Sequence, residues 1–310
     1  MPIVLNAEVA TDAQLVRTPR TTARIFAAAF FPTALIGALL SCAYLMSVGY
    51  TPLAALLISE TPVIALIILF ERVFPNRAVW NESQGDVLTD AGHTFTILIL
   101  GGLSVPLILV GGMWLSNAIG SDVWPSNWPL AAQFVLALVL AEAVLYLVHR
   151  LQHQVPLLWR FHSLHHSPRR LYWLNTYRFH IVDILMNAVP GYGLLIALGI
   201  GDEAFALFGL ATVIVGFFQH GNLEFNGRLS NWFFSTPDLH RWHHSNVAAE
   251  SNHNYGQTVI VWDVLFGTRF LPESADTLQI GMASPSNFPT KYLAQVLAPF
   301  RWKQLERSGR

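Results

Sequence analysis

Three long stretches of the sequence contain no lysine and no arginine, and this restricts the possible folds more than any other feature. The eighteen basic residues all fall in the intervals 17–24, 72–77, 150–178 and 228–310. Between them lie three stretches without a basic residue, 25–71, 78–149 and 179–227. Each holds enough apolar residues for two bilayer crossings, at about 20 residues per helix. We therefore expect a membrane protein whose basic segments all lie on one side, the cytoplasmic side.

The composition agrees with this expectation. Hydrophobic residues make up 53% of the chain and charged residues 12%, whereas a soluble domain is about 25% charged. The single cysteine, Cys42, excludes a disulfide framework and a cysteine-based zinc site. The net charge of -1 gives no electrostatic reason to expect nucleic acid as a partner.

The apolar stretches predict an all-α integral membrane protein, a bundle of four to six transmembrane helices with a helical cap on the cytoplasmic side. Four crossings are expected at about 26–48, 52–70, 94–116 and 129–148. The third is interrupted by Gly101, Gly102 and Pro106. Residues 181–219 form either a full hairpin or a shallow re-entrant pair, because the second segment is short and Pro190 breaks the first.

One membrane domain, residues 25–275, is expected between two tails. Residues 1–24 are predicted to be a cytoplasmic N-terminal tail with no removable signal peptide. Residues 276–310 are predicted to be a cytoplasmic C-terminal tail, and its end alternates apolar and basic residues, as in a helix lying on a lipid surface. Glu60 falls inside the second crossing; an intramembrane carboxylate is a functional candidate, but near a short outer turn it could simply reach water.

Histidines gather in three clusters. They are His149-x-x-x-His153, His162-x-x-His165-His166 and His240-x-x-His243-His244. Spacings of three and four residues place side chains on one face of a helix, so each cluster can direct its imidazoles at one point. Imidazole is a ligand for Zn, Cu, Fe and Ni. Eight histidines exceed the four ligands of a structural zinc and the three of a catalytic zinc, so two metal ions are expected.

Two familiar metal arrangements do not fit. The sequence has no H-E-x-x-H motif of zinc proteases, and haem needs only two axial histidines. Glu142 and Tyr146 share a helix face with His149 and His153, and either one could accept the second ring N–H of a metal-bound histidine.

The clusters and the sequences that flank them resemble those of the fatty acid hydroxylase / sterol desaturase superfamily of integral-membrane di-iron oxygenases. That family has the order H-x(3–4)-H, H-x(2–3)-H-H and a second H-x(2–3)-H-H, which the three clusters match. Short flanking sequences are also similar to those of the family, among them Pro156-Leu-Leu-Trp159, Thr236-Pro237, Asn254-Tyr255-Gly256 and Trp262-Asp263. The resemblance covers about 140–270 specifically, and the rest of the chain only by hydropathy.

The resemblance implies a di-iron centre that uses O2 to attack an unactivated C–H bond of a lipid or sterol-like substrate. It also implies an external electron donor, because the sequence shows no haem, flavin or iron–sulfur motif. His180 and His220 resemble further ligand positions of the family, although Ile181 replaces the proline that often follows the first of them. His253 is a weaker candidate, and His93 has no partner in the sequence. Six aromatic residues could line a substrate channel or anchor the chain at the interface: Trp159, Phe161, Tyr172, Trp173, Tyr177 and Phe179.

Several alternatives stay open. Hydroxylation and desaturation begin with the same hydrogen abstraction, and an ether-lipid monooxygenase that uses a reduced pterin has similar motifs. A membrane metal transporter or sensor would instead need polar residues along a path across the bilayer. A purely structural metal site would need fewer ligands and full coordination. A metal site that faces the cytoplasm suits a bacterial inner membrane or an endoplasmic reticulum, and the bacterial inner membrane is the expected location, because the tail shows no obvious retrieval signal.

Overall fold

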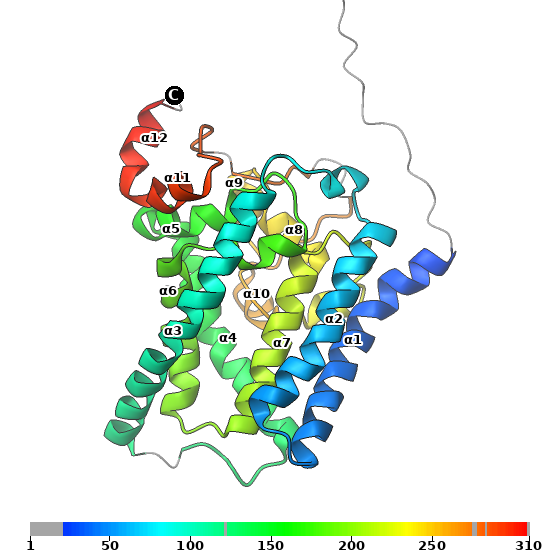
Figure 1. The fold of residues 1–310 in the computed structure, drawn as a ribbon, viewed down its shortest axis with the longest axis vertical. Coiled ribbons are helices and arrows are strands. Elements are labelled where there is room, and N and C mark those ends of the chain that lie inside the picture. The colour runs from blue at the N-terminus through cyan, green and yellow to red at the C-terminus, as the bar shows by residue number, and fades with distance from the viewer. Residues whose placement is uncertain (1–20, 121–122, 275–277, 283, 309–310) are drawn as a thin grey trace, which may run out of the picture.

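The computed structural model describes residues 21–120, 123–274, 278–282 and 284–308. The predicted N-terminal tail, 1–24, therefore lies almost wholly outside the described residues. Six long helices stand side by side, with short helices gathered at one end of them (Figure 1). The long helices are α1 (Thr21–Ser47), α2 (Pro52–Val73), α3 (Val87–Ile119), α4 (Leu130–Gln154), α6 (Ile181–Ala197) and α7 (Asp202–His220).

The short helices that form the cap at the upper end in Figure 1 are α5 (Pro156–His166), α8 (Pro237–His243), α9 (Ala248–Ser251), α11 (Tyr292–Leu297) and α12 (Trp302–Ser308). One further short helix is α10 (Val261–Phe266), and the remaining helical turns are 3-10 segments, including η2 (Trp173–Tyr177). The described residues form isolated β-bridges but no β-strand. The prediction of an all-helical fold is confirmed.

Four helices are long and apolar enough to cross a membrane: Ile25–Ser47, Pro52–Val73, Leu130–Gln154 and Asp202–His220. They agree with the first, second and fourth predicted crossings and with the second half of 181–219. The third predicted crossing differs, because α3 continues without a break through Gly101, Gly102 and Pro106. A proline inside a membrane helix is tolerated where neighbouring helices support the backbone, and α3 packs along α6.

Local sequence explains where the helices begin and turn. Thr51 caps α2, since its hydroxyl accepts a hydrogen bond from the backbone N–H of Ala54 at 3.3 Å, and Pro52 occupies the first turn. Proline also disfavours the helical conformation in the residue before it, so α4 ends at Gln154, Val155 is extended, and α5 starts at Pro156. This corner places the histidines of α4 beside those of α5.

Close packing joins the long helices. Aromatic side chains of α1, α2 and α7 interlock around Phe31 and Phe218, whose ring centroids lie 5.1 Å apart. Helix α6 approaches α4 at Gly191, where an added Cβ would lie 2.6 Å from Leu145 Cδ2. Only glycine allows this approach without a shift of the Leu145 side chain.

Buried carboxylates at the cap ends of α2 and α3 hold the segment that links α5 to α6. Asp90 accepts hydrogen bonds from Tyr172 Oη at 2.7 Å and Asn175 Nδ2 at 3.0 Å, and it pairs with Arg178. Glu71 accepts from the backbone N–H of Trp173 at 3.0 Å. These hydrogen bonds and the Asp90–Arg178 ion pair offset the cost of burying the carboxylates, and they hold the segment beneath the cap.

Replacing Asp90 by alanine should destabilise the protein by about 3 kcal/mol, because the Arg178 charge would stay buried without its partner. Thermal unfolding in detergent should show a clear fall in Tm. The matched control is Glu82→Ala, since Glu82 is exposed, and it should leave Tm unchanged. Equal Tm values for the two variants would contradict this account of the segment.

Candidate metal centre

Nine histidines meet at the cap end of the bundle in two groups that could each hold a metal ion. We name them site A, which is His149, His153, His162, His166 and His243, and site B, which is His165, His220, His240 and His244. In each group the ligand atoms lie within 4.8 Å of one another. The structure thus brings all eight histidines of the three sequence motifs together and adds His220 from the end of α7.

The helical period decides which site each histidine joins. In α5, His162 and His166 are four residues apart and belong to site A, whereas His165 turns to site B. In α8 and its C-cap the order is reversed, with His240 and His244 in site B and His243 in site A. Residues at i and i+4 share a helix face, and the middle histidine of each motif, His165 or His243, lies off that face. Each H-x-x-H-H motif therefore serves both sites.

Hydrogen bonds to Nδ1 leave the Nε2 lone pairs facing one another. In site B, His165 Nδ1 lies 3.3 Å from the Arg178 carbonyl and His220 Nδ1 lies 2.9 Å from the Gly216 carbonyl. A carbonyl only accepts, so both rings carry their proton on Nδ1 and an unshared pair on Nε2. These two Nε2 atoms are 3.3 Å apart.

Site A repeats this arrangement. His149 Nδ1 donates to the Tyr255 carbonyl at 2.7 Å, and His162 Nδ1 lies 3.1 Å from Asp183 Oδ2, while their Nε2 atoms are 3.0 Å apart. His153 Nε2 and His243 Nε2 are buried without a hydrogen-bond partner in the described part of the chain. Two neutral imidazoles whose lone pairs face each other cannot hydrogen-bond, so a cation between them is what this donor set fits.

The histidine side chains are buried from solvent, and this burial keeps the imidazoles neutral. Among the nine histidines only His153 is half-buried, and the others are buried. For five of those that lie outside the long helices, burial lowers the pKa well below the ordinary value and neighbouring imidazoles lower it further; they are His165, His166, His240, His243 and His244. Neutral imidazole is the form that binds a metal.

A loop from 252 to 258 supplies several acceptors for the ring N–H groups. The carbonyl of His253 lies 2.8 Å from His243 Nδ1, and Asn252 Oδ1 lies 3.2 Å from His153 Nδ1. Asp263 accepts the backbone N–H groups of Tyr255 and Gly256 at 2.8 Å and 2.7 Å. The backbone of His253, and not its ring, thus serves the centre, since its ring belongs to neither group.

Glu142 and Tyr146 act on this part of the chain and form no hydrogen bond to a histidine ring in the described structure. Glu142 is fully buried and accepts from the backbone N–H of Gln257 at 3.0 Å and of Thr258 at 2.8 Å. Tyr146 Oη lies 3.0 Å from Thr268 Oγ1. Both side chains therefore help to position the loop that carries the Tyr255 carbonyl. They support the histidine rings through this loop and not by direct hydrogen bonds, which the sequence had suggested.

Two other histidines lie away from both groups. His180 caps α6, because its Nδ1 accepts from the backbone N–H of Val182 at 3.1 Å, and its ring packs against Phe161. His93 pairs with Gln295 Oε1 at 2.9 Å. Asp183, which holds His162 Nδ1 at 3.1 Å, was not expected from the sequence, because a carboxylate in the first turn of a helix is common and does not by itself indicate a ligand partner.

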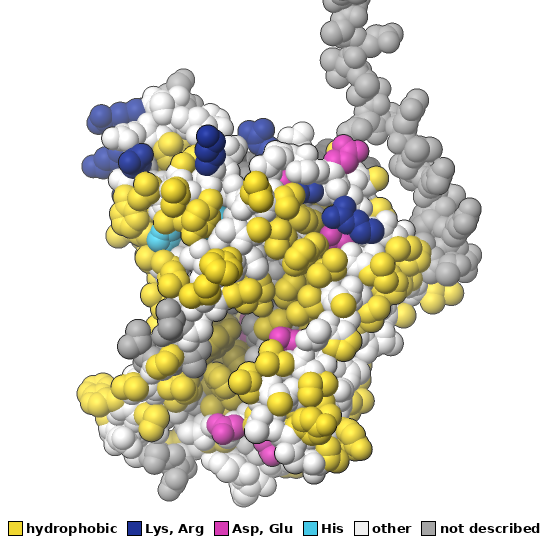
Figure 2. Space-filling model, viewed as in Figure 1, with side chains coloured by type: hydrophobic (Ala, Val, Ile, Leu, Met, Phe, Trp, Pro, Cys, Tyr) yellow, Lys and Arg dark blue, Asp and Glu magenta, His cyan; other side chains and the backbone are white. Residues whose placement is uncertain are grey.

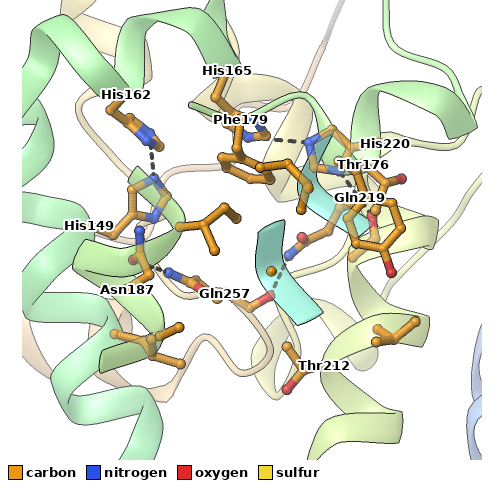
Figure 3. A pocket seen from close by; sticks show the side chains of 18 of the residues that line it. His149, His162, His165, Thr176, Phe179, Asn187, Thr212, Gln219, His220 and Gln257 are labelled. Atoms are coloured by element: carbon orange, nitrogen blue, oxygen red, sulfur yellow. Dashed lines mark hydrogen bonds between the residues drawn. The ribbon is translucent and has the colours of Figure 1, made fainter. Parts of the chain in front are cut away.

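A cavity of about 500 Å³ lies under both sites, between α3, α4, α6 and α7. Histidines of both sites line it, and they are His149, His162, His165, His220 and His240. Figure 3 shows four of these rings, His149, His162, His165 and His220, at one end of the cavity, with Gln257 and Thr212 further along it. Most of the remaining wall is apolar.

The six candidate aromatics separate into different places. Tyr177 and Phe179 line the cavity, and the Phe179 ring stacks on His165 at 4.1 Å. Trp159 lines a second cavity of about 320 Å³ that reaches His153 and His166 from the cap side. Tyr172, Trp173 and Phe161 line neither cavity.

The fold and the site define a helical protein of membrane type with two buried, imidazole-only groups, each of which could hold a metal ion, above an apolar cavity. The family model of the fatty acid hydroxylases matches residues 134–268. The chain is 38% identical over 248 residues to an ornithine lipid hydroxylase, OlsE, of Rhizobium tropici, covering 77% of this chain and 74% of that protein.

More distant relatives agree with this match. An alkylglycerol monooxygenase of Xenopus tropicalis is 27% identical over 184 residues, 59% of this chain and 40% of that protein. A putative Delta(7)-sterol-C5(6)-desaturase of Arabidopsis thaliana is 28% identical over 155 residues, 47% and 51% respectively. No solved structure matches the chain. The chain belongs to the fatty acid hydroxylase family, and the prediction of an oxidoreductase of this family is confirmed.

Single histidine variants should reveal two separable sites. His153→Ala should lower the content of one metal and His220→Ala that of the other, each to roughly half of the wild-type value, because each removes one ligand from one group. His180→Ala should retain both metals and is the matched control. Metal analysis of the purified variants tests this, and full loss of metal in the control would contradict the assignment.

The metal-free protein should lose stability in acid. The five cap histidines have lowered pKa values in the folded state, so the unfolded chain binds more protons as the pH falls through its ordinary histidine pKa of about 6.5. After chelation, Tm should be steady above pH 7.5 and fall progressively below about pH 6.5. A Tm that is unchanged down to pH 5 would contradict the burial of neutral imidazoles.

Proposed function

We propose that this protein is an O2-dependent di-iron oxygenase that hydroxylates a lipid at an unactivated C–H bond. The observation that carries the proposal is the position of two imidazole-only sites at one end of an apolar cavity. Iron is among the metals that imidazole binds well. Two bound irons would supply the redox chemistry with O2, so that one oxygen atom enters the C–H bond and the other leaves as water.

The residues of the chain would bind, orient and protect. Nine Nε2 atoms would hold the metals. Backbone carbonyls, Asn252 and Asp183 fix six of the nine rings through Nδ1. Glu142 and Asp263 hold the loop on which some of those carbonyls lie. The apolar cavity would exclude water from the reacting carbon and admit a lipid chain. Two electrons and two protons per turnover must come from an external donor.

Relatives favour hydroxylation over desaturation. The protein from Rhizobium tropici is a hydroxylase and is more identical to this chain than the putative desaturase, at 38% against 28%. The protein from Xenopus tropicalis is a monooxygenase and matches over a longer stretch than the putative desaturase, 184 against 155 residues. Ornithine lipid is accordingly the first substrate to test. A metal transporter is not favoured, because the histidines gather at one end of the bundle and the described wall of the cavity carries no second ligand group.

We also propose the setting. Basic side chains gather on the cap and apolar ones over the bundle in the view of Figure 2, which supports a cap that faces the cytoplasm. The bacterial relative supports an inner-membrane location. The end of the C-terminal tail, 276–310, would lie at the interface, since Leu293 and Phe300 are 71% and 70% exposed beside Arg301 and Lys303. Residues 25–275 would form the membrane domain.

The decisive experiment is metal analysis and turnover on the same anaerobically purified sample. We expect about two irons per chain, as the two groups require, and a product of ornithine lipid heavier by one oxygen atom, formed only with O2 and a reductant. Asp183→Asn should lower metal affinity or activity roughly 10- to 100-fold, because the His162 ring loses its anionic acceptor. One zinc per chain and no oxidised lipid would refute the proposal.

A further inference from the structure

Three polar groups on the cavity side of the bundle have hydrogen-bonding capacity that the described protein does not use. Tyr177 of η2 and Tyr192 of α6 line the cavity, and neither hydroxyl forms a hydrogen bond within the described residues. Glu60 of α2 has a buried Oε2 atom without a hydrogen-bond partner there. None of these groups takes part in sites A and B.

Helix register places Glu60 at the level of the cavity. Helices α2 and α7 pack together and run in the same direction, because an added Cβ at Gly209 would lie 3.5 Å from Leu56 and one at Gly221 would lie 3.3 Å from Ile67. Glu60 follows Leu56 by four residues on the same face. It is therefore level with Val213 of α7, which lines the cavity.

The same register gives the distance to the metal sites along the bundle. His220 lies seven residues beyond Val213, so Glu60 is about 10 Å below site B along the helix axis, at a rise of about 1.5 Å per residue. A single lipid molecule is long enough to reach from Glu60 to the metals. In Figure 2 an acidic side chain is visible beside the hollow in the apolar face.

Electrostatics indicate that the three groups are neighbours. Burial raises the pKa of the Tyr177 phenol, and the Glu60 carboxylate and the Tyr192 phenol raise it further. Tyr177 therefore stays neutral and offers both a donor and an acceptor. Leu56 and Ile64, one turn on either side of Glu60, pack into the apolar core. A carboxyl group in such surroundings is costly unless something pairs with it.

We propose that Glu60, Tyr177 and Tyr192 bind the ammonium group of the substrate, so that the lipid oxidised here is an amino lipid. This inference rests on the proposed function, which supplies the lipid. An ammonium group has three N–H donors, which a carboxylate and two phenol oxygens can accept. Aromatic rings also attract cations. The pair of opposite charges replaces the lone carboxylate that the bundle otherwise leaves unpaired.

The remaining cavity wall supports one cationic group and no more. Apart from the histidines, the lining residues carry no charged side chain, and the amides Asn187, Gln219 and Gln257 are neutral. Gln257 Nε2 donates to Asn187 Oδ1 at 2.7 Å, and Gln219 Nε2 donates to two backbone carbonyls, so these amides are already engaged. Of the described carboxylates near this cavity, Glu142 accepts from the backbone N–H groups of Gln257 and Thr258, and Asp183 accepts from Gln152 and lies against His162. Glu60 is the one of the three with a buried oxygen atom that lacks a hydrogen-bond partner.

The test is calorimetric titration of the metal-loaded protein in non-ionic detergent with dodecylamine and with 1-dodecanol. Wild type should bind the amine more tightly than the alcohol. Glu60→Gln should weaken amine binding by roughly 30-fold or more, the usual loss when a buried charge pair is broken, and should not change alcohol binding. Tyr177→Phe and Tyr192→Phe should each weaken amine binding by roughly 2- to 10-fold, the effect of one hydrogen bond.

The matched control is Thr61→Val, because Thr61 adjoins Glu60 and is exposed; its affinities should equal those of wild type. Should Glu60→Gln fail to fold, the two tyrosine variants decide the question. Unchanged amine affinity in the variants would overturn the proposal. If wild type oxidises lipids but does not distinguish amine from alcohol, this inference fails and the proposed function stands. If wild type binds the amine through Glu60 but oxidises no lipid, the proposed function fails and the amine site stands.

Discussion

The structure depends on keeping nine imidazoles neutral and dry in a small volume. Each ring needs an acceptor at Nδ1 and presents its lone pair at Nε2, so at least two such pairs, His149 with His162 and His165 with His220, repel each other unless a cation lies between them. The apolar bundle below and the cap above exclude the water that could otherwise separate them. Apolar packing, loop anchoring and helix corners can all be understood as means of holding these lone pairs together.

Buried carboxylates outside the two sites hold the backbone segments whose carbonyls orient the histidine rings. Buried carboxylates at the ends of α2 and α3 fix the segment before α6, which provides the Arg178 carbonyl for His165. Glu142 and Asp263 fix the loop that provides the Tyr255 carbonyl for His149. Because a carbonyl is set by its backbone and not by a rotatable side chain, the rings are oriented more rigidly than side-chain acceptors alone would allow.

Much of this could be predicted from sequence, because it follows from period and polarity. The basic-free stretches gave the helix positions, and the spacing of the three histidine motifs gave eight of the nine clustered rings. Contacts between distant segments could not be read in this way. His180 caps a helix because α6 begins there, Asp183 holds His162 because α5 and α6 meet, and α3 continues through Pro106 because α6 supports it. Such outcomes are decided by tertiary packing, which the spacing of residues along the sequence does not predict.

The division of each H-x-x-H-H motif between the two sites has a consequence for how the metals are acquired. Inserting or deleting one residue in α5 or α8 would rotate the following side chains by about 100°, and histidines that belong to one site would turn to the other. Loading is coupled for the same reason: an ion in site A orders α5 and α8, and these helices and the α8 C-cap carry three of the four ligands of site B. In the wild-type protein, where both sites are intact, the second ion should therefore bind more tightly than the first, and chains with one ion should be scarce when metal is limiting.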